Sequence, residues 1–203
     1  PVATEEVPSA NQKPIESSLG KDPNSFFLSQ FYTPQWNPDG PSASNNCGPA
    51  SLAMACKAFG ELPPGADAND PERLIESVRE AMTGNRDNSQ LTSYEQIEAG
   101  AQRSGLKAQM VVGLDNIDQS LSTGAMVVAG GNPARAWGSR LASADYAHFN
   151  GGHFVLIVGK NGDNYTVNDP LSKTGSITVS SSEMQAYLSD ASMGYGEGVA
   201  VWK

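Results

Sequence analysis

The stretch "SNNCGPASLAMACKAFG", residues 44–60, decides how the rest of the chain is interpreted. Asn45 or Asn46 can cap a helix here, and Pro49 suits the first turn because its missing N–H needs no partner there. The residues that follow are small or apolar on nearly every side, up to the glycine that ends the stretch. Since a helix that is apolar all round is a buried one, the sequence predicts a buried helix that starts near Cys47.

Cys47 lies where a helix concentrates unpaired N–H groups and a partial positive charge. A thiol in that position has a lowered pKa, which favours the nucleophilic thiolate. The Cys47 N–H can point at a developing oxyanion, and Gly48 can let a substrate approach closely. The alternative is a small buried residue without chemistry, which describes Cys56 better. We therefore predict that Cys47 is a nucleophile.

A disulfide between the two cysteines is excluded by their spacing. Cys47 and Cys56 are nine residues apart, or about 13.5 Å along one helix, whereas bridged cysteines need Cα atoms within roughly 7 Å. Both are predicted to be free thiols, which leaves the redox compartment open.

Composition narrows the class of protein. The chain has 203 residues, enough for one domain with a substantial core. Its net charge is -9 and its pI about 4.6, and without a basic stripe to neutralise phosphates this argues against nucleic-acid binding. No stretch approaches the roughly 20 apolar residues of a membrane span. The chain starts without an initiator methionine or an apolar leader, as a mature or shortened form would.

The order of elements predicts an α+β fold. Residues 1–24 are rich in Pro, Ser, Glu and Asn and are interpreted as a flexible arm or linker, and 25–203 as one domain. Helices come first and short strands second, which favours an N-terminal helical half packed on a mainly antiparallel sheet. The expected helices are 44–60, 70–84, 92–105, 114–124 and 181–190, and the expected strands are 106–113, 125–130, 153–159, 165–169, 175–180 and 198–203.

A thiolate nucleophile needs an imidazole as its ion-pair partner and as the acid for the leaving group. The chain has two histidines. His153 follows two glycines and starts "HFVLIVG", a strand in which it shares a face with Val155 and Ile157. His148 lies in a long loop and is the alternative. We predict that His153 is the base.

The imidazole needs an orienting group, and an oxyanion hole usually needs a second donor. Asp169 in "YTVNDP" lies sixteen residues after His153 and can return to it across a hairpin. Asn168 is a competitor, and a plain Asx-Pro turn is the structural alternative. Gln30 in "LSQFYTPQW" is the candidate side-chain donor, with Gln35 as the fallback.

The blocks "SQFYTPQWNP…NNCGPASLAM", "HFVLIVG" and "YTVNDP" resemble the papain-like cysteine peptidases related to the bacteriocin-processing (double-glycine leader) peptidases. The resemblance runs from about Phe27 to Lys203. It implies a papain-like catalytic domain in which Cys47 is the nucleophile, His153 the general base and acid, Asp169 the orienter and Gln30 the oxyanion donor.

The sequence thus predicts a thiol-dependent hydrolase that cleaves an amide, most readily a peptide bond, through a thioester. A glutamine deamidase, an acyl transferase acting as a secreted effector, and a non-catalytic peptide-binding module remain alternatives. Neither a cofactor nor a metal is expected, since the two cysteines lie too far apart to complete a zinc site with the histidines. The expected partners are a peptide or protein substrate and an inhibitor or immunity-type protein, and export from a bacterial cell is the favoured setting. Trp137, in the long loop, is expected in the core or the wall of a substrate groove.

Overall fold

A computed structural model of the chain describes residues 19–30, 45–141 and 149–203. Two of the alternatives from the sequence, Gln35 and His148, lie outside these ranges.

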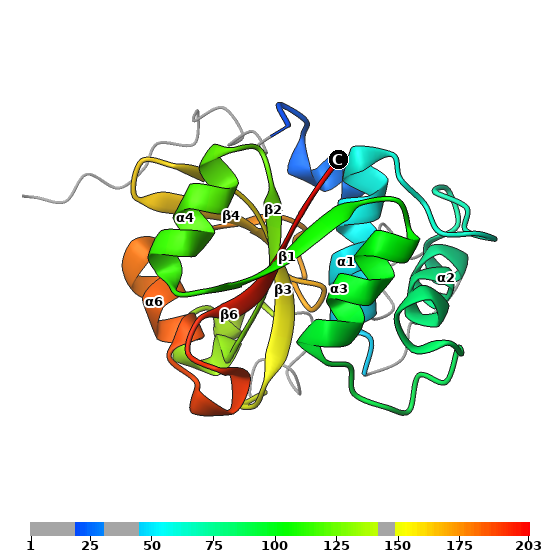
Figure 1. Cartoon of the computed structure of the whole chain (residues 1–203). Helices are drawn as coiled ribbons and strands as arrows, with labels where there is room; N and C mark the ends of the chain where they lie inside the picture. The colour runs from blue at the N-terminus through cyan, green and yellow to red at the C-terminus, as the bar shows by residue number, and fades with distance from the viewer. Residues whose placement is uncertain (1–18, 31–44, 142–148) are drawn as a thin grey trace, which may run out of the picture.

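A six-stranded sheet separates two layers of helices (Figure 1). The strands run in the order β1-β6-β2-β3-β4-β5, and every neighbouring pair is antiparallel. α1, α2 and α3 lie on one side of the sheet, and α4 and α6 lie on the other. The bounds are α1 (Cys47–Phe59), α2 (Pro71–Thr83), α3 (Tyr94–Arg103), α4 (Leu114–Ser122), α6 (Ser181–Leu188), β1 (Lys107–Val112), β2 (Met126–Gly131), β3 (His153–Asn161), β4 (Asn164–Asn168), β5 (Ile177–Ser180) and β6 (Glu197–Trp202), with short 3-10 turns η1 (Pro23–Phe26), η2 (Pro133–Arg135), η3 (Gly138–Arg140) and η4 (Ala191–Met193). None of the helices in these ranges is long and apolar enough to cross a membrane.

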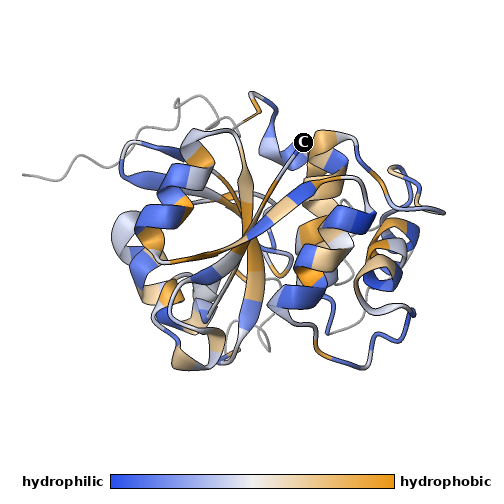
Figure 2. Ribbon diagram, viewed as in Figure 1, coloured by the Kyte–Doolittle hydropathy of each residue, from blue (hydrophilic) through white to orange (hydrophobic). Residues whose placement is uncertain are grey.

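The central strands supply both layers with apolar side chains, as the orange strands in Figure 2 illustrate. Along β3, Phe154 and Leu156 belong to the core beneath α1, whereas Val155 and Ile157 belong to the core beneath α4 and α6. This follows from the period of two along a strand. A strand buried on both faces therefore reads as one apolar run, which is why the sequence shows it so clearly.

α1 is the buried helix that the sequence predicts. Leu52 and Met54 are completely inaccessible to solvent, and the helix ends at Gly60, whose left-handed φ of 73° suits a glycine. The expected cap differs. Asn46 occupies the N-cap position, but its side chain makes no hydrogen bond to the first turn, because its oxygen accepts a hydrogen bond from α2 instead.

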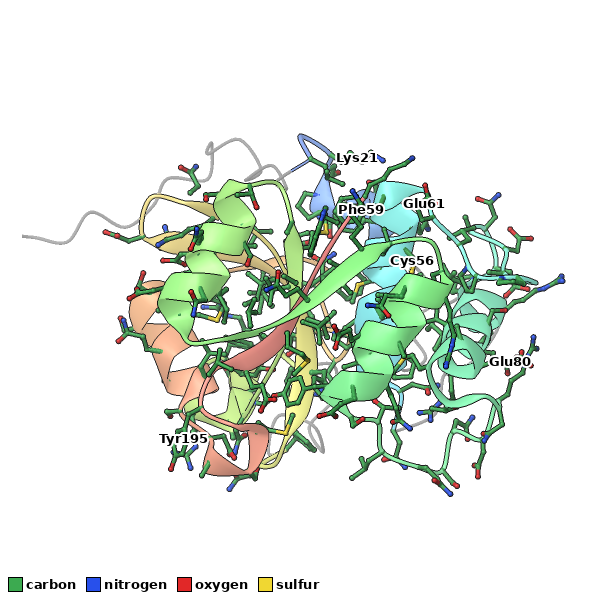
Figure 3. The ribbon with its side chains drawn as sticks, in the orientation of Figure 1. Lys21, Cys56, Phe59, Glu61, Glu80 and Tyr195 are labelled. Atoms are coloured by element: carbon green, nitrogen blue, oxygen red, sulfur yellow. The ribbon has the colours of Figure 1, made fainter. Side chains whose placement is uncertain are left out.

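The segment before α1 is tied to the far end of that helix. The Lys21 ammonium donates to the carbonyl of Ala58 at 2.5 Å, and Lys21 lies close to Phe59 in Figure 3. At the same end, Lys203 pairs with Glu61 at 3.1 Å. The boundary of the arm at residue 24 stays a prediction, but residues 19–24 already contact the folded domain.

Candidate active site

Cys47 is the first residue of α1 and is half-buried. Burial raises the pKa of its thiol, but a hydrogen bond with the His153 side chain, the charge of that imidazole and backbone hydrogen bonds from Phe154 and Gly48 together outweigh burial. The net result is a lowered pKa. The sulfur is thus held in an environment that favours the thiolate.

Cys56 shows what the same residue does without such partners. It lies nine residues further along α1 with no exposed surface. Burial raises the pKa of its thiol to about 12, against smaller opposing effects that include a hydrogen bond with Ser104. Both cysteines are free, so one helix carries an activated thiol and an inert one.

His153 is the first residue of β3, so its ring lies at the end of the sheet, where α1 begins. The ring is 2% exposed, and its Nε2 lies 2.7 Å from Oδ1 of Asp169. Burial lowers the pKa of this imidazole, but the charge and hydrogen bond of Asp169, with a contribution from Cys47, raise it to about 10. Because Nε2 faces the carboxylate, Nδ1 is the nitrogen left for the sulfur. The arrangement favours a thiolate–imidazolium pair.

Asp169 follows the last residue of β4 and is completely buried. Besides contacting His153, its carboxylate accepts hydrogen bonds from the Trp137 indole N–H to Oδ2 and from the Leu171 N–H to Oδ1, both at 2.8 Å. A buried carboxylate with three such partners is fixed in orientation. The hairpin from β3 to β4 thus places Asp169 where the sequence analysis expected it.

Trp137 lies in the core, which is one of the two places that the sequence suggested for it. It is 1% exposed, and its only polar atom is used on Asp169. Its ring stacks on Tyr187 of α6, with centroids 4.6 Å apart and planes at 26°. No spacing rule links Trp137 to Asp169, which lies 32 residues later, so sequence reasoning missed this contact.

Tyr187 lies against the ends of β2 and β3, next to the backbone of His153. Its hydroxyl lies 2.7 Å from the carbonyl oxygen of His153 and 2.9 Å from that of Ala129, on the neighbouring strand. A Cβ at Gly131 would lie 2.3 Å from the Tyr187 carbonyl oxygen, so α6 approaches β2 this closely only because that position is glycine.

Asn168, the competitor for the orienting role, has other partners. Its amide N–H donates to the Pro23 carbonyl at 3.0 Å, and its amide oxygen accepts from the Ser176 hydroxyl. Asp169 is the residue in contact with the imidazole. Asn168 instead joins the start of the described chain to the loop before β5.

Gln30 is 2% exposed, and its backbone N–H donates to the carbonyl of Pro170 at 2.9 Å. This bond joins the segment before α1 to the residue that follows Asp169. Gln30 is thereby brought to the same region as the carboxylate, although its role as an oxyanion donor stays a prediction.

Gly48 has a packing role that the sequence did not suggest, and its role in admitting a substrate stays a prediction. A Cβ there would lie 2.3 Å from Oγ1 of Thr92 and 3.5 Å from the ring of Phe154. The glycine thus lets the first turn of α1 pack against the residue before the N-cap of α3.

Comparisons with known proteins concern the family and the fold of the chain. The Peptidase_C39-like family model matches residues 27–192. A solved C39-like peptidase from Bacillus anthracis has 17% identity and a TM-score of 0.54, with 87% of this chain and 94% of that one covered.

Two further solved structures are similar. The peptidase domain of ComA, a bifunctional ABC transporter from Streptococcus, has 15% identity, coverage of 87% and 95%, and a TM-score of 0.48. A double-glycine-motif protease from an AMS/PCAT transporter, solved with a leader peptide, has 19% identity, coverage of 78% and 85%, and a TM-score of 0.49. No curated protein matches the chain.

The match with the family model spans most of the chain, and the fold is the expected α+β, papain-like one. The chain belongs to the Peptidase_C39-like family and is a cysteine peptidase.

Proposed function

We propose that the chain hydrolyses a peptide bond by a Cys47-His153-Asp169 triad through a thioester. The observation that carries the proposal is the imidazole of His153, which bonds the Asp169 carboxylate at 2.7 Å on one side and the Cys47 thiol on the other. A nucleophile, a base and an orienter in hydrogen-bonded sequence are what nucleophilic acyl transfer requires.

In the first half of the reaction the Cys47 sulfur attacks the substrate carbonyl carbon, and the oxygen becomes an oxyanion. The Cys47 N–H and the Gln30 side chain are the proposed donors to that oxygen. His153 gives its Nδ1 proton to the leaving amine, so that the C–N bond breaks and the thioester remains. In the second half His153 takes a proton from water and the hydroxide attacks the thioester. The C–S bond then breaks, the acid leaves, and the thiolate–imidazolium pair is restored.

The two cysteines allow the nucleophile to be tested within one molecule. Native protein is treated with iodoacetamide from about pH 5 to pH 10, and the labelled cysteine is identified by peptide mass spectrometry. We expect Cys47 to be alkylated well below the ordinary thiol pKa of about 8.5, because its pKa is lowered, and Cys56 to stay unlabelled, because its pKa is about 12 and it is buried. Equal labelling of both thiols, or a Cys47 rate unaffected by His153→Ala, would contradict the proposal.

Turnover is tested on a complex peptide mixture with wild type and Cys47→Ala. We expect new peptide termini with wild type alone. A mass gain of about 1 Da at glutamine without new termini would identify a deamidase, and no difference between the two proteins would overturn hydrolysis of either bond. Cys56→Ser is the matched control and should cleave like wild type.

A further inference from the structure

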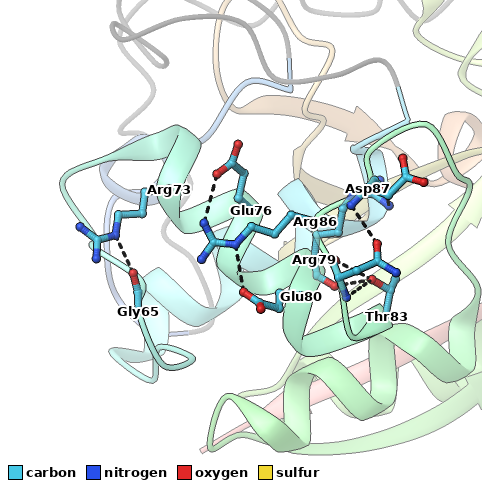
Figure 4. A network of polar contacts seen from close by, with 9 residues as sticks. Gly65, Arg73, Glu76, Arg79, Glu80, Thr83, Arg86 and Asp87 are labelled. Carbon is cyan, nitrogen blue, oxygen red and sulfur yellow. Dashed lines mark hydrogen bonds and ion pairs between the residues drawn. The ribbon is translucent and has the colours of Figure 1, made fainter.

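Arg79 is a buried cation on a helix whose other arginine, Arg73, is exposed. It lies on α2 and is 1% exposed. In Figure 4, Arg86 pairs with Glu76 and Glu80, whereas Arg79 points toward the loop that holds Asp87. Among the described residues no carboxylate forms an ion pair with Arg79. A guanidinium with this degree of burial is costly unless its hydrogen bonds are satisfied.

Its hydrogen bonds all go to neutral oxygens, and two of these oxygens belong to the residues directly before the nucleophile. Nε donates to the side-chain oxygen of Asn46 at 2.7 Å, and Nη2 donates to the Asn45 carbonyl at 2.8 Å. Nη1 donates to the carbonyls of Asp87 and Gln90 at 3.0 and 3.1 Å. One planar group thereby joins α2, the two residues directly before Cys47 and the loop that leads to α3.

This arrangement explains the missing cap of α1. The Asn46 oxygen that would normally accept a first-turn N–H is bound to Arg79 instead. The N–H groups in the first turn of α1 therefore receive no hydrogen-bond acceptor from the Asn46 side chain. They can act on the sulfur or on a substrate oxygen, as the Gly48 backbone already does for the sulfur.

The positive charge of Arg79 also acts on the sulfur. Burial lowers the pKa of this guanidinium, while Cys47 and Asp87 raise it, so thiolate and guanidinium stabilise each other. Within the described part of the chain, the other titratable groups that interact with Cys47 are His153 in contact, Asp169 through His153, and Tyr187 at longer range. Arg79 supplies the second positive charge of this set.

The geometry points to Arg79 as a positioning residue for the nucleophile: it fixes the backbone before Cys47 and places a buried positive charge near the sulfur. The inference rests on the proposed triad but concerns a residue that touches neither the substrate nor the imidazole. A lysine cannot replace the fork of donors, although it keeps the charge.

The test compares Arg79→Met and Arg79→Lys with Arg73→Met. Arg73 is the matched control because it lies on the same helix, is exposed, and donates to the backbone carbonyl of Gly65 at 2.7 Å rather than to the residues directly before Cys47. Three quantities are measured on folded protein: the pH midpoint of Cys47 alkylation, kcat, and KM on a cleaved peptide.

We expect Arg79→Met to move the alkylation midpoint to higher pH and to lower kcat by about 100-fold, the scale of a misplaced catalytic group, with little change in KM. Arg79→Lys should keep the midpoint near that of wild type but still lower kcat. A midpoint and kcat equal to those of wild type in Arg79→Met, with a lower Tm alone, would overturn the inference. If Arg79→Met fails to fold, wild-type kcat in Arg79→Lys overturns it. The alkylation of Cys47 needs no turnover. An absence of peptide cleavage would therefore refute the proposed function, while the alkylation midpoints would still decide the role of Arg79.

Discussion

At the scale of single residues, the reactivity of the site comes from partners rather than from exposure. Cys47 and Cys56 share one helix, yet the pKa of the first is lowered and that of the second is raised to about 12. The difference is the His153 imidazole and the backbone donors at the start of the helix. Asp169 in turn keeps that imidazole charged, and Trp137 and the Leu171 N–H hold Asp169.

The pH profile should report the charge of Asp169. The carboxylate raises the pKa of His153, which is protonated up to about pH 10, so wild-type kcat/KM should fall in the alkaline range as the imidazolium loses its proton. In Asp169→Asn the negative charge is gone, the imidazolium loses its proton at lower pH, and the alkaline limb should move to lower pH. The measurement is kcat/KM against pH for both proteins. An unmoved limb would assign it to another group.

Trp137→Phe isolates one hydrogen bond. The substitution keeps an aromatic ring to stack on Tyr187 but removes the N–H that donates to Asp169. We expect a loss of about 1–3 kcal/mol in the free energy of unfolding, typical of a buried acceptor left without its partner, together with a lower kcat. Urea unfolding and steady-state kinetics measure the two effects. A variant with unchanged kcat would show that Asp169 is held well enough by Leu171 and His153.

At the scale of elements, the nucleophile depends on the fit between α1 and the start of α3. Gly48 leaves room for Thr92, whose hydroxyl is buried without a hydrogen-bond partner among the described residues. Because this hydroxyl makes no such hydrogen bond, replacing Thr92 with alanine costs no hydrogen-bond energy.

A double-mutant cycle tests this fit. Gly48→Ala should destabilise the protein and slow Cys47 alkylation, because the new Cβ would lie 2.3 Å from Thr92 Oγ1. Thr92→Ala removes that oxygen and leaves its Cβ at 3.6 Å, an ordinary contact, so the double variant should recover most of the loss. Urea unfolding of the four proteins gives the coupling energy. Additive effects would mean that Gly48 serves the substrate instead, as the sequence suggested.

The same elements show how far the sequence alone could go. The apolar patterns of the sequence predicted the α-helices and strands that the described residues form. The signal is plainest in α1, β2 and β3, because these elements are buried on nearly every side. Cys47, His153 and Asp169 were candidates because their residue types and local settings suit the chemistry. Trp137 and Arg79 carried no such signal: a buried indole and a buried guanidinium are defined by partners that are distant in the chain. The cap at Asn46 was misjudged for the same reason.

At the scale of the whole molecule, the site is assembled from one helical layer and from the sheet. Cys47 is the first residue of α1, His153 is the first residue of β3, and Asp169 directly follows the last residue of β4. The segment before α1 makes further contacts with the residues around Asp169. The Gln30 N–H donates to the Pro170 carbonyl, and the Pro23 carbonyl accepts from the Asn168 amide. Burial of α1 against the sheet thus positions the reacting groups.

Asn168→Ala separates this architectural role from catalysis. The change removes the donor to the Pro23 carbonyl, 145 residues away in the chain, and the acceptor of the nearby Ser176 hydroxyl. We expect a loss of about 1–3 kcal/mol in the free energy of unfolding but wild-type pH dependence of Cys47 alkylation below the unfolding transition. Urea unfolding and alkylation provide the comparison. A changed alkylation profile would return Asn168 to the list of groups that act on the imidazole.

The hydroxyl of Tyr187 has a consequence for solvent exchange. Strand ends ordinarily fray and exchange their amide protons quickly. Here the Tyr187 hydroxyl lies within hydrogen-bond distance of the carbonyls of Ala129 and of His153, and His153 belongs to the last pair of the β2–β3 ladder. Deuterium should therefore enter the catalytic end of this ladder as slowly as its centre. Slow exchange at this end would mean that the sheet itself holds the His153 imidazole in place.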